Sequence, residues 1–180
     1  YANILEFFVA FGSVILLTVV VFADVLKPFI IRSEAYWEAM WIVPIILLAN
    51  LCLGIYHNLS VWYKITDRTK FGAYISVVGA IITLLINYYF IPEYSYKASA
   101  IATLIAYATM MLLSYFFGSK YYPIPYNLKR IGFYLIMSIG LSALSFYKYR
   151  GEYLIGITML IVFLGLVVVL EKNKLKKYLT

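Results

Sequence analysis

The sequence predicts an all-α polytopic membrane protein with six transmembrane helices. Of its 180 residues, 64% are hydrophobic and 13% are charged, whereas soluble domains carry roughly 25% charged residues. A single globular core of this length cannot bury so much apolar side chain. The charged residues also fall in clumps that are separated by six uncharged blocks of 17 to 25 residues. Blocks of that length match the hydrocarbon thickness that a membrane-spanning helix crosses.

The six blocks predict helices over approximately residues 4–23, 40–63, 71–91, 98–118, 131–147 and 153–170. Only helices and closed barrels satisfy their backbone hydrogen bonds inside a bilayer. A barrel would show shorter segments of strict alternation, which these Leu-, Ile-, Val- and Phe-rich blocks lack. Pro92 is expected to end the third helix, because proline lacks the backbone N–H that continues a helix.

The distribution of basic residues predicts the topology. On the side of the N-terminus, the second loop, the fourth loop and the C-terminal tail together hold 10 of the 15 Lys and Arg residues. Short basic loops stay in the cytoplasm, so we expect both termini to be cytoplasmic. The net charge of +7 follows from this asymmetry and favours contact with anionic membrane lipids over nucleic acid.

Sequence signatures of catalysis and metal binding are missing. The single cysteine, Cys52, and the single histidine, His57, exclude a disulfide framework and a cysteine- or histidine-rich metal cluster. The common nucleophile, zinc, phosphate and dinucleotide motifs do not occur. No charged residue lies at the middle of a predicted span, which argues against a proton relay. We therefore expect a protein that is not an enzyme and that needs no cofactor or metal.

Small and polar residues form stripes on four of the helices. Residues three or four apart share a helical face, and such a face is typical of helix packing or of a wet cavity. The two most polar stripes are Asn50, Gly54, His57 and Asn58 in the second helix, and Gly72, Ser76, Gly79, Thr83 and Asn87 in the third. Shorter stripes are Ser99, Thr103, Ala106 and Met110 in the fourth helix, and Ser138, Ser142 and Ser145 in the fifth.

Two interpretations of these stripes stay open. Packing explains the small residues, including Ser76 and Thr83. The amides and His57 either form hydrogen bonds between helices or line a cavity, because an unpartnered amide in hydrocarbon costs roughly 2–7 kcal/mol. The sixth helix is almost uniformly apolar, so we expect it to face lipid. The basic loop residues Lys64, Arg68 and Lys70 either only fix the topology or help to capture an anionic substrate.

Residues 1–145 resemble part of a known transporter family, and the specific part of the resemblance is residues 62–107. The features that carry the resemblance are the basic stretch 62–70, the helix after it that ends in Ile91-Pro92, and Ala98-Ser99-Ala100-Ile101-Ala102-Thr103 at the start of the next helix. This pattern resembles the carboxy-terminal half of polysaccharide exporters, which are lipid-linked oligosaccharide flippases in the superfamily that also holds multidrug exporters. The glycines usual in the short loop are replaced here by Ser95 and Lys97.

The resemblance implies one six-helix bundle, over residues 1–180, of a two-bundle carrier in the bacterial inner membrane. The start at Tyr1 then leads us to expect that an N-terminal bundle precedes this chain and is its partner. The implied activity is alternating access, and the implied substrate is an undecaprenyl-diphosphate-linked glycan for polysaccharide or O-antigen biosynthesis. The candidate cavity residues are Asn50, His57, Asn58, Lys64, Arg68, Lys70, Ser76, Thr83 and Asn87. Alternatives are a multidrug antiporter of the same superfamily, a membrane enzyme of glycan assembly and a non-transport membrane subunit.

Overall fold

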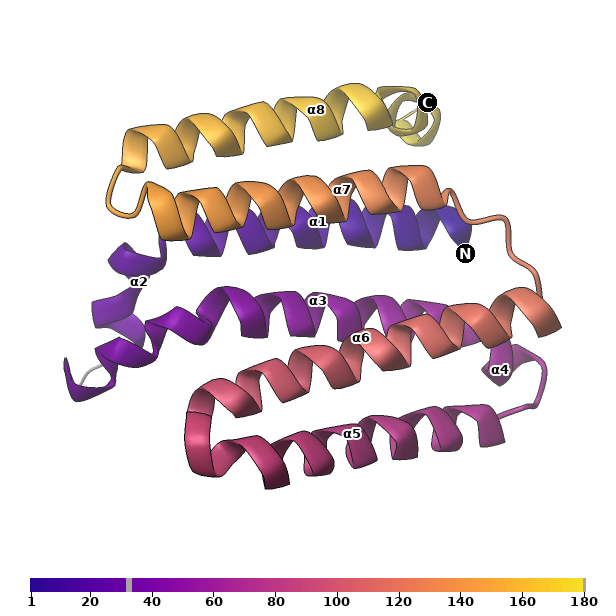
Figure 1. Ribbon diagram of the computed structural model, residues 1–180. Helices are drawn as coiled ribbons and strands as arrows, with labels where there is room; N and C mark the ends of the chain where they lie inside the picture. The colour runs from indigo at the N-terminus through magenta and orange to yellow at the C-terminus, as the bar shows by residue number, and fades with distance from the viewer. Residues whose placement is uncertain (32–33, 180) are drawn as a thin grey trace. The chain divides into compact units, whose positions relative to one another are not determined.

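A computed structural model describes residues 1–31 and 34–179, apart from the side chains of residues 30, 35, 36 and 173–179. The described residues form helices and no strands (Figure 1), which confirms the all-α fold class. Within them lie six helices long and apolar enough to cross a membrane: Ala2–Val21, Trp37–Ile65, Lys70–Tyr94, Tyr96–Tyr121, Leu128–Lys148 and Tyr153–Lys172. The predicted number of spans is therefore confirmed. Most helices extend beyond the uncharged blocks, because charged and aromatic residues also fit a helix at the depth of the headgroups.

The elements in chain order are α1 (Ala2–Val21), α2 (Ala23–Ile30), η1 (Glu34–Ile42), α3 (Val43–Leu59), α4 (Val61–Ile65), α5 (Lys70–Tyr94), α6 (Tyr96–Tyr121), α7 (Leu128–Ala143), η2 (Leu144–Lys148) and α8 (Tyr153–Leu179). Here η1 is a 3₁₀-helix and η2 is a π-helical turn. The expectation that Pro92 ends the third helix is wrong, because α5 continues to Tyr94. The chain turns at Ser95, whose φ is 50°, so the turn and not the proline ends the helix.

The chain divides into two compact units. The first comprises residues 1–8 and 41–127, and the second comprises residues 9–40 and 128–180. Helix α1 thus gives its first turns to one unit and its remainder to the other. That all six helices form one bundle stays a prediction.

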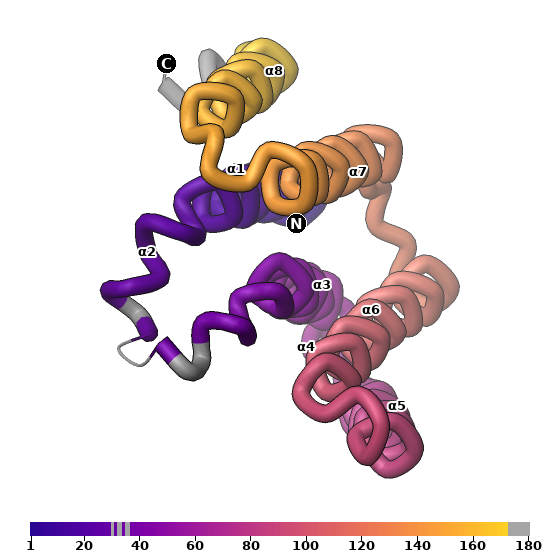
Figure 2. Tube along the Cα trace, turned by 60° about the vertical axis from the view of Figure 1, so that its left-hand side comes forward, coloured from indigo at the N-terminus to yellow at the C-terminus, as the bar shows by residue number. Residues whose placement is uncertain are grey.

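In the first unit, α6 packs against both α3 and α5 (Figure 2). Every fourth residue of α6 is buried along one seam: Ala98, Ala102, Ala106, Met110, Ser114 and Gly118. Small side chains at such a seam let neighbouring helices approach closely. The sequence stripe correctly included Ala106 and Met110. Ser99 and Thr103 are half-buried and flank the seam, because a stripe defined by polarity alone overlooks alanine.

In the second unit, α1, α7 and α8 share a core of Leu17, Val21 and Phe163. Ser138, Ser142 and Ser145 of the predicted fifth-helix stripe are all buried. Gly156 of α8 is a place of close approach, since a Cβ added there would contact Val21. This unit therefore buries a row of hydroxyl groups beside its apolar core.

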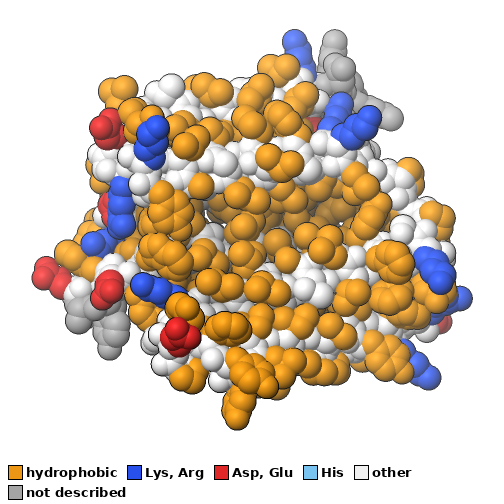
Figure 3. All heavy atoms as spheres, in the orientation of Figure 1, with side chains coloured by type: hydrophobic (Ala, Val, Ile, Leu, Met, Phe, Trp, Pro, Cys, Tyr) orange, Lys and Arg blue, Asp and Glu red, His pale blue; other side chains and the backbone are white. Residues whose placement is uncertain are grey.

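Hydrophobic side chains cover the helix surfaces, and Lys, Arg, Asp and Glu lie toward the helix ends (Figure 3). Only 11% of the most apolar window of α8 is buried within the chain, which fits a lipid-facing helix. The same fraction holds for α5, although α5 carries the most regular small and polar stripe. Much of the surface of α5 is therefore available to lipid or to a partner outside this chain.

Candidate functional site

The most polar feature of the first unit is a line of exposed side chains on α3 and α4. Asn50, His57 and Lys64 are all exposed and lie at intervals of seven residues, which is close to two helical turns. At 1.5 Å per residue, the line from Asn50 to Lys64 covers about 21 Å of the span. We call these three residues the α3 polar line. The Asn50 Nδ2 donates a hydrogen bond to the carbonyl oxygen of Ile46 at 2.9 Å, so its amide oxygen is not used in that bond.

Asn58 and Gly54 flank this line. The Asn58 Nδ2 donates a hydrogen bond to the Gly54 carbonyl oxygen at 3.0 Å, and Asn58 is half-buried. A Cβ added at Gly54 would overlap the ring of Phe8. Gly54 is thus a packing position. The side-chain NH2 group of Asn58 already donates one hydrogen bond within its own helix. The structure separates the predicted stripe into an exposed polar line and a packed edge.

The α5 stripe divides in a similar way. Gly72 and Gly79 lie against Tyr63 and Met110, so the two glycines allow α5 to pack closely. Ser76 is exposed and Thr83 is half-buried, with the Thr83 hydroxyl donating to the Gly79 carbonyl oxygen at 3.0 Å. The packing interpretation therefore fits the glycines, and the hydroxyl group of Thr83 has a partner on its own helix.

Asn87 is the one candidate amide with an unpartnered buried atom. Its Oδ1 atom is buried and has no hydrogen-bond partner among the described residues. An unpaired buried acceptor carries a desolvation cost of about 1–3 kcal/mol. Asn87 is therefore a position at which a donor from a ligand, a water or a partner chain would be stabilising.

The three basic candidates in and beside the loop between α4 and α5 are all exposed. Helix α4 ends at Ile65, and Asp67 adopts a φ of 54°. Lys64 and Arg68 therefore do not share the face of one continuous helix, as they would if the second helix continued through the loop. The Arg68 guanidinium instead lies over the ring of Tyr121, 4.7 Å from its centroid.

An aromatic cluster supports this loop, and the sequence analysis did not single it out. Trp62 is 1% exposed, and its Nε1 donates to the Ser114 carbonyl oxygen at 3.1 Å. Its ring lies near those of Tyr63, Phe71 and Tyr121. The available signal was the density of aromatic residues on both sides of the basic loop, but a ring at a helix end is more often an interfacial anchor. Arg68 contacts this cluster through the ring of Tyr121, which packs near the buried Trp62.

The second unit contains a buried carboxylate beside α7, near the C-terminal end of the α8 span. Glu171 is 2% exposed and accepts a hydrogen bond from the Tyr134 hydroxyl at 2.8 Å. The Arg130 Nη1 lies 3.7 Å from the same Oε1 atom. In the first unit, Glu6 is 3% exposed and lies in the second turn of α1. The sequence placed both glutamates at the borders of spans, and only tertiary packing shows that they are buried.

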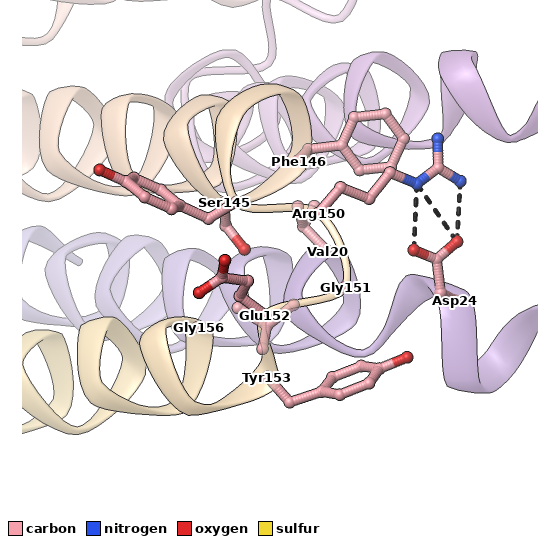
Figure 4. Close-up of a pocket in the computed structure, with 11 residues that line it drawn as sticks. Val20, Asp24, Ser145, Phe146, Arg150, Gly151, Glu152, Tyr153 and Gly156 are labelled. Atoms are coloured by element: carbon pink, nitrogen blue, oxygen red, sulfur yellow. Dashed lines mark hydrogen bonds and ion pairs between the residues drawn. The ribbon is translucent and has the colours of Figure 1, made fainter.

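At the opposite ends of these helices, Arg150 and Asp24 form a paired contact. The Arg150 Nη2 and Nε donate to the Asp24 carboxylate at 2.7 and 3.0 Å, and Figure 4 shows the guanidinium aimed at both oxygens. These hydrogen bonds lower the pKa of the Asp24 carboxyl and raise the pKa of the Arg150 guanidinium. The adjoining cavity of about 10 Å³ holds about one water. It is therefore not a substrate site.

The described residues contain no group of three or more His, Cys, Asp or Glu side chains placed to hold a metal ion. A larger cavity, of about 390 Å³, lies in the first unit near the turn between α5 and α6. Its volume falls within the roughly 300–1,000 Å³ of small-molecule sites.

Comparisons with protein-family models, with curated proteins and with solved structures give no match to this chain.

Proposed function

We propose that this chain is part of a carrier that moves an anionic, lipid-linked oligosaccharide of the undecaprenyl-diphosphate type across the bacterial inner membrane. The observation that carries the proposal is the exposed α3 polar line on a helix long and apolar enough to span the bilayer. An amide or imidazole that faces hydrocarbon is costly, so this face is expected to meet water, a substrate or a polar partner. A glycan headgroup that crosses the bilayer needs such a path, while its lipid tail stays in the hydrocarbon.

Two further features support the same substrate class. Lys64 places a cation at one end of the α3 polar line, and Arg68 and Lys70 add two more in the adjoining loop. A diphosphate is a compact anion to which arginine donates two parallel hydrogen bonds and lysine contributes a point charge. The resemblance of residues 62–107 to polysaccharide exporters agrees with a lipid diphosphate as the anion. In this proposal both termini lie in the cytoplasm, so the loop meets the inner leaflet.

A substitution test addresses the α3 polar line. The double substitution Asn50→Leu with His57→Leu, placed in the complete reading frame, is expected to reduce glycan export in intact cells while the membrane-inserted amount stays normal. Thr158→Leu is the matched control, because Thr158 is an exposed polar residue on α8. Unchanged export with normal insertion of the double variant would exclude a transport role for the line.

A second pair of substitutions separates the two roles of the loop. Lys64→Gln with Arg68→Gln leaves Lys70 and the other basic residues of that side to fix the orientation. Reduced export with normal insertion supports substrate capture. Normal export shows that these charges only set the topology, which a reporter fused after Thr180 measures independently.

A cation-coupled multidrug antiporter is the second candidate. Such a carrier needs a buried ionisable group, and Glu6 and Glu171 are both buried. For Glu171, the hydrogen bond from Tyr134 and the nearby Arg130 guanidinium favour a structural role over a coupling site. Drug efflux that depends on an ion gradient and is lost in Glu171→Gln would favour the antiporter.

A further inference from the structure

An apolar groove lies between the α5 and α6 helices beside the turn that joins them. The groove is lined by one face of α5, one face of α6 and the side chain of Trp41. The lining residues are Trp41, Ile86, Phe90, Tyr94, Lys97, Ala98, Ile101 and Ile105. Residues 86, 90 and 94 are four apart, as are 97, 101 and 105, so each set forms one stripe. We call this cavity the α5–α6 groove. All of its lining residues belong to the first unit.

Polarity changes along the groove in one direction. Lys97 lies at the turn end, in the first turn of the α6 span, which begins at Tyr96 directly after the turn at Ser95. Ile101 and Ile105 lie deeper in the α6 span, and at 1.5 Å per residue Ile105 is about 12 Å from Lys97 along the helix. The turn end corresponds to headgroup depth, and the remainder of the groove corresponds to the depth of acyl chains.

Lys97 is the only charged residue of the lining. It is exposed, and its Nζ lies 5.6 Å from the centroid of the Trp41 ring. No described carboxylate forms an ion pair with it, although Glu93 is nearby in the sequence and exposed. An ammonium group held beside an aromatic ring at headgroup depth attracts a lipid phosphate.

We propose that the α5–α6 groove binds a hydrocarbon chain of an anionic phospholipid, with the lipid phosphate at Lys97. The order of chemistry, a cation at headgroup depth followed by an apolar channel, is complementary to such a lipid. An anionic phospholipid supplies both parts at once, an acyl chain for the groove and a phosphate for Lys97. This site is separate from the proposed transport function, because lipid binding here needs neither the α3 polar line nor the basic loop.

Photolabelling in lipid nanodiscs tests the proposal. The probes are phosphatidylglycerol and phosphatidylcholine that carry the same photoactivatable group in the acyl chain, and mass spectrometry maps the labelled residues of the full chain. We expect phosphatidylglycerol to label residues 86–105 in preference to phosphatidylcholine. The preference should be about five-fold, as expected for one interfacial cation near an anionic lipid.

Three variants make the test specific. Lys97→Gln should remove the preference for phosphatidylglycerol, whereas Lys148→Gln should keep it. Lys148 is a suitable control because it is also an exposed cation beside an aromatic ring, 5.5 Å from the Tyr149 centroid, outside the groove. Ile101→Phe should reduce labelling by both lipids, because its larger side chain narrows the groove.

Several outcomes would overturn the proposal. Equal labelling by the two lipids would exclude the headgroup site, as would a preference that Lys97→Gln leaves unchanged. Labelling spread evenly over α5, α6 and α8 would show ordinary bilayer contact. Absence of lipid label together with cross-linking of Ile101→Cys to another protein segment would show that a protein helix occupies the groove.

Discussion

The two units of this chain hold their helices together with different chemistry. The first unit joins α3, α5 and α6 through small residues and aromatic rings, as at Gly79 against Met110 and Gly118 against Trp62. The second unit adds polar contacts to its apolar core, as at Tyr134 with Glu171 and at Arg150 with Asp24.

This difference teaches that apolar composition alone does not determine how membrane-spanning helices associate. Lipid tails are as apolar as leucine, so close packing and interhelical hydrogen bonds supply the attraction. A seam of small residues is sensitive to added volume. A polar contact is sensitive to the loss of one atom and, where a carboxylate takes part, to pH.

The largest expected effect is at Trp62. Trp62→Ala should lower the free energy of unfolding by about 3–5 kcal/mol, because it removes a buried ring and leaves a cavity. Unfolding in mixed micelles by added denaturing detergent measures this change. Trp41→Ala is the control, since the Trp41 side chain is 37% exposed. Equal losses in the two variants would contradict the special role of the aromatic cluster.

The next effect tests the second unit. Tyr134→Phe deletes only the hydroxyl that donates to Glu171 and should cost about 1.5–3 kcal/mol, the range for a hydrogen bond to a charged group. Tyr147→Phe is the matched control, because Tyr147 is 56% exposed. Hydrogen exchange should show the loosening in α7 and α8. Exchange that rises only in the first unit would refute the assignment.

A pair of glycine substitutions tests the seam of the first unit. Gly79→Leu should destabilise the chain by about 1–3 kcal/mol through overpacking, because an added Cβ would overlap Met110. Gly140→Leu is the control, since a Cβ at Gly140 meets no atom within 4 Å. The control should be neutral, or stabilising by up to about 1 kcal/mol through helix propensity. Equal changes in the free energy of unfolding for Gly79→Leu and Gly140→Leu, in the same unfolding assay, would contradict a close-packed seam at Gly79.

The smallest effect is the ion pair of the second unit. Asp24→Asn should cost about 0.2–1 kcal/mol at pH 7, because Arg150 is 42% exposed and solvent screens the pair. The pKa of Asp24 is lowered from 3.8 in the folded chain. Its contribution is therefore fully present well above pH 3.8 and is lost as the pH falls through the lower folded value.

Unfolding measured from pH 7 down to the acid limit of the assay checks this dependence. The difference between the wild type and Asp24→Asn should begin to shrink as the pH approaches 3.8 and should continue to shrink below it. Asp67→Asn is the control, because Asp67 is exposed and asparagine also tolerates its φ of 54°. A difference that disappears between pH 5 and 7 would assign the effect to another group.

Several features could be predicted from the sequence because they depend on composition along the chain. The six spans follow from uncharged blocks whose length matches the bilayer, and the burial of Ser138 and Ser142 follows from their helical spacing. The predicted α5 stripe correctly indicated helix packing at Gly72 and Gly79, where the absence of a side chain lets Tyr63 and Met110 approach α5 closely. The candidate site was less predictable, because a stripe identifies a shared face but not what covers that face.

By itself, the sequence determined the helical class, the number of spans and the residues that share each helical face, since these depend on hydrophobicity and a fixed period. Only the tertiary structure decided which faces are covered. It placed Asn50 and His57 on an exposed line, buried Glu171 beside Tyr134, ended α4 before Arg68 and formed the α5–α6 groove around Lys97. The burial of Glu171 beside Tyr134 and the position of Trp41 at the groove depend on contacts between segments far apart in the chain, which no local pattern specifies.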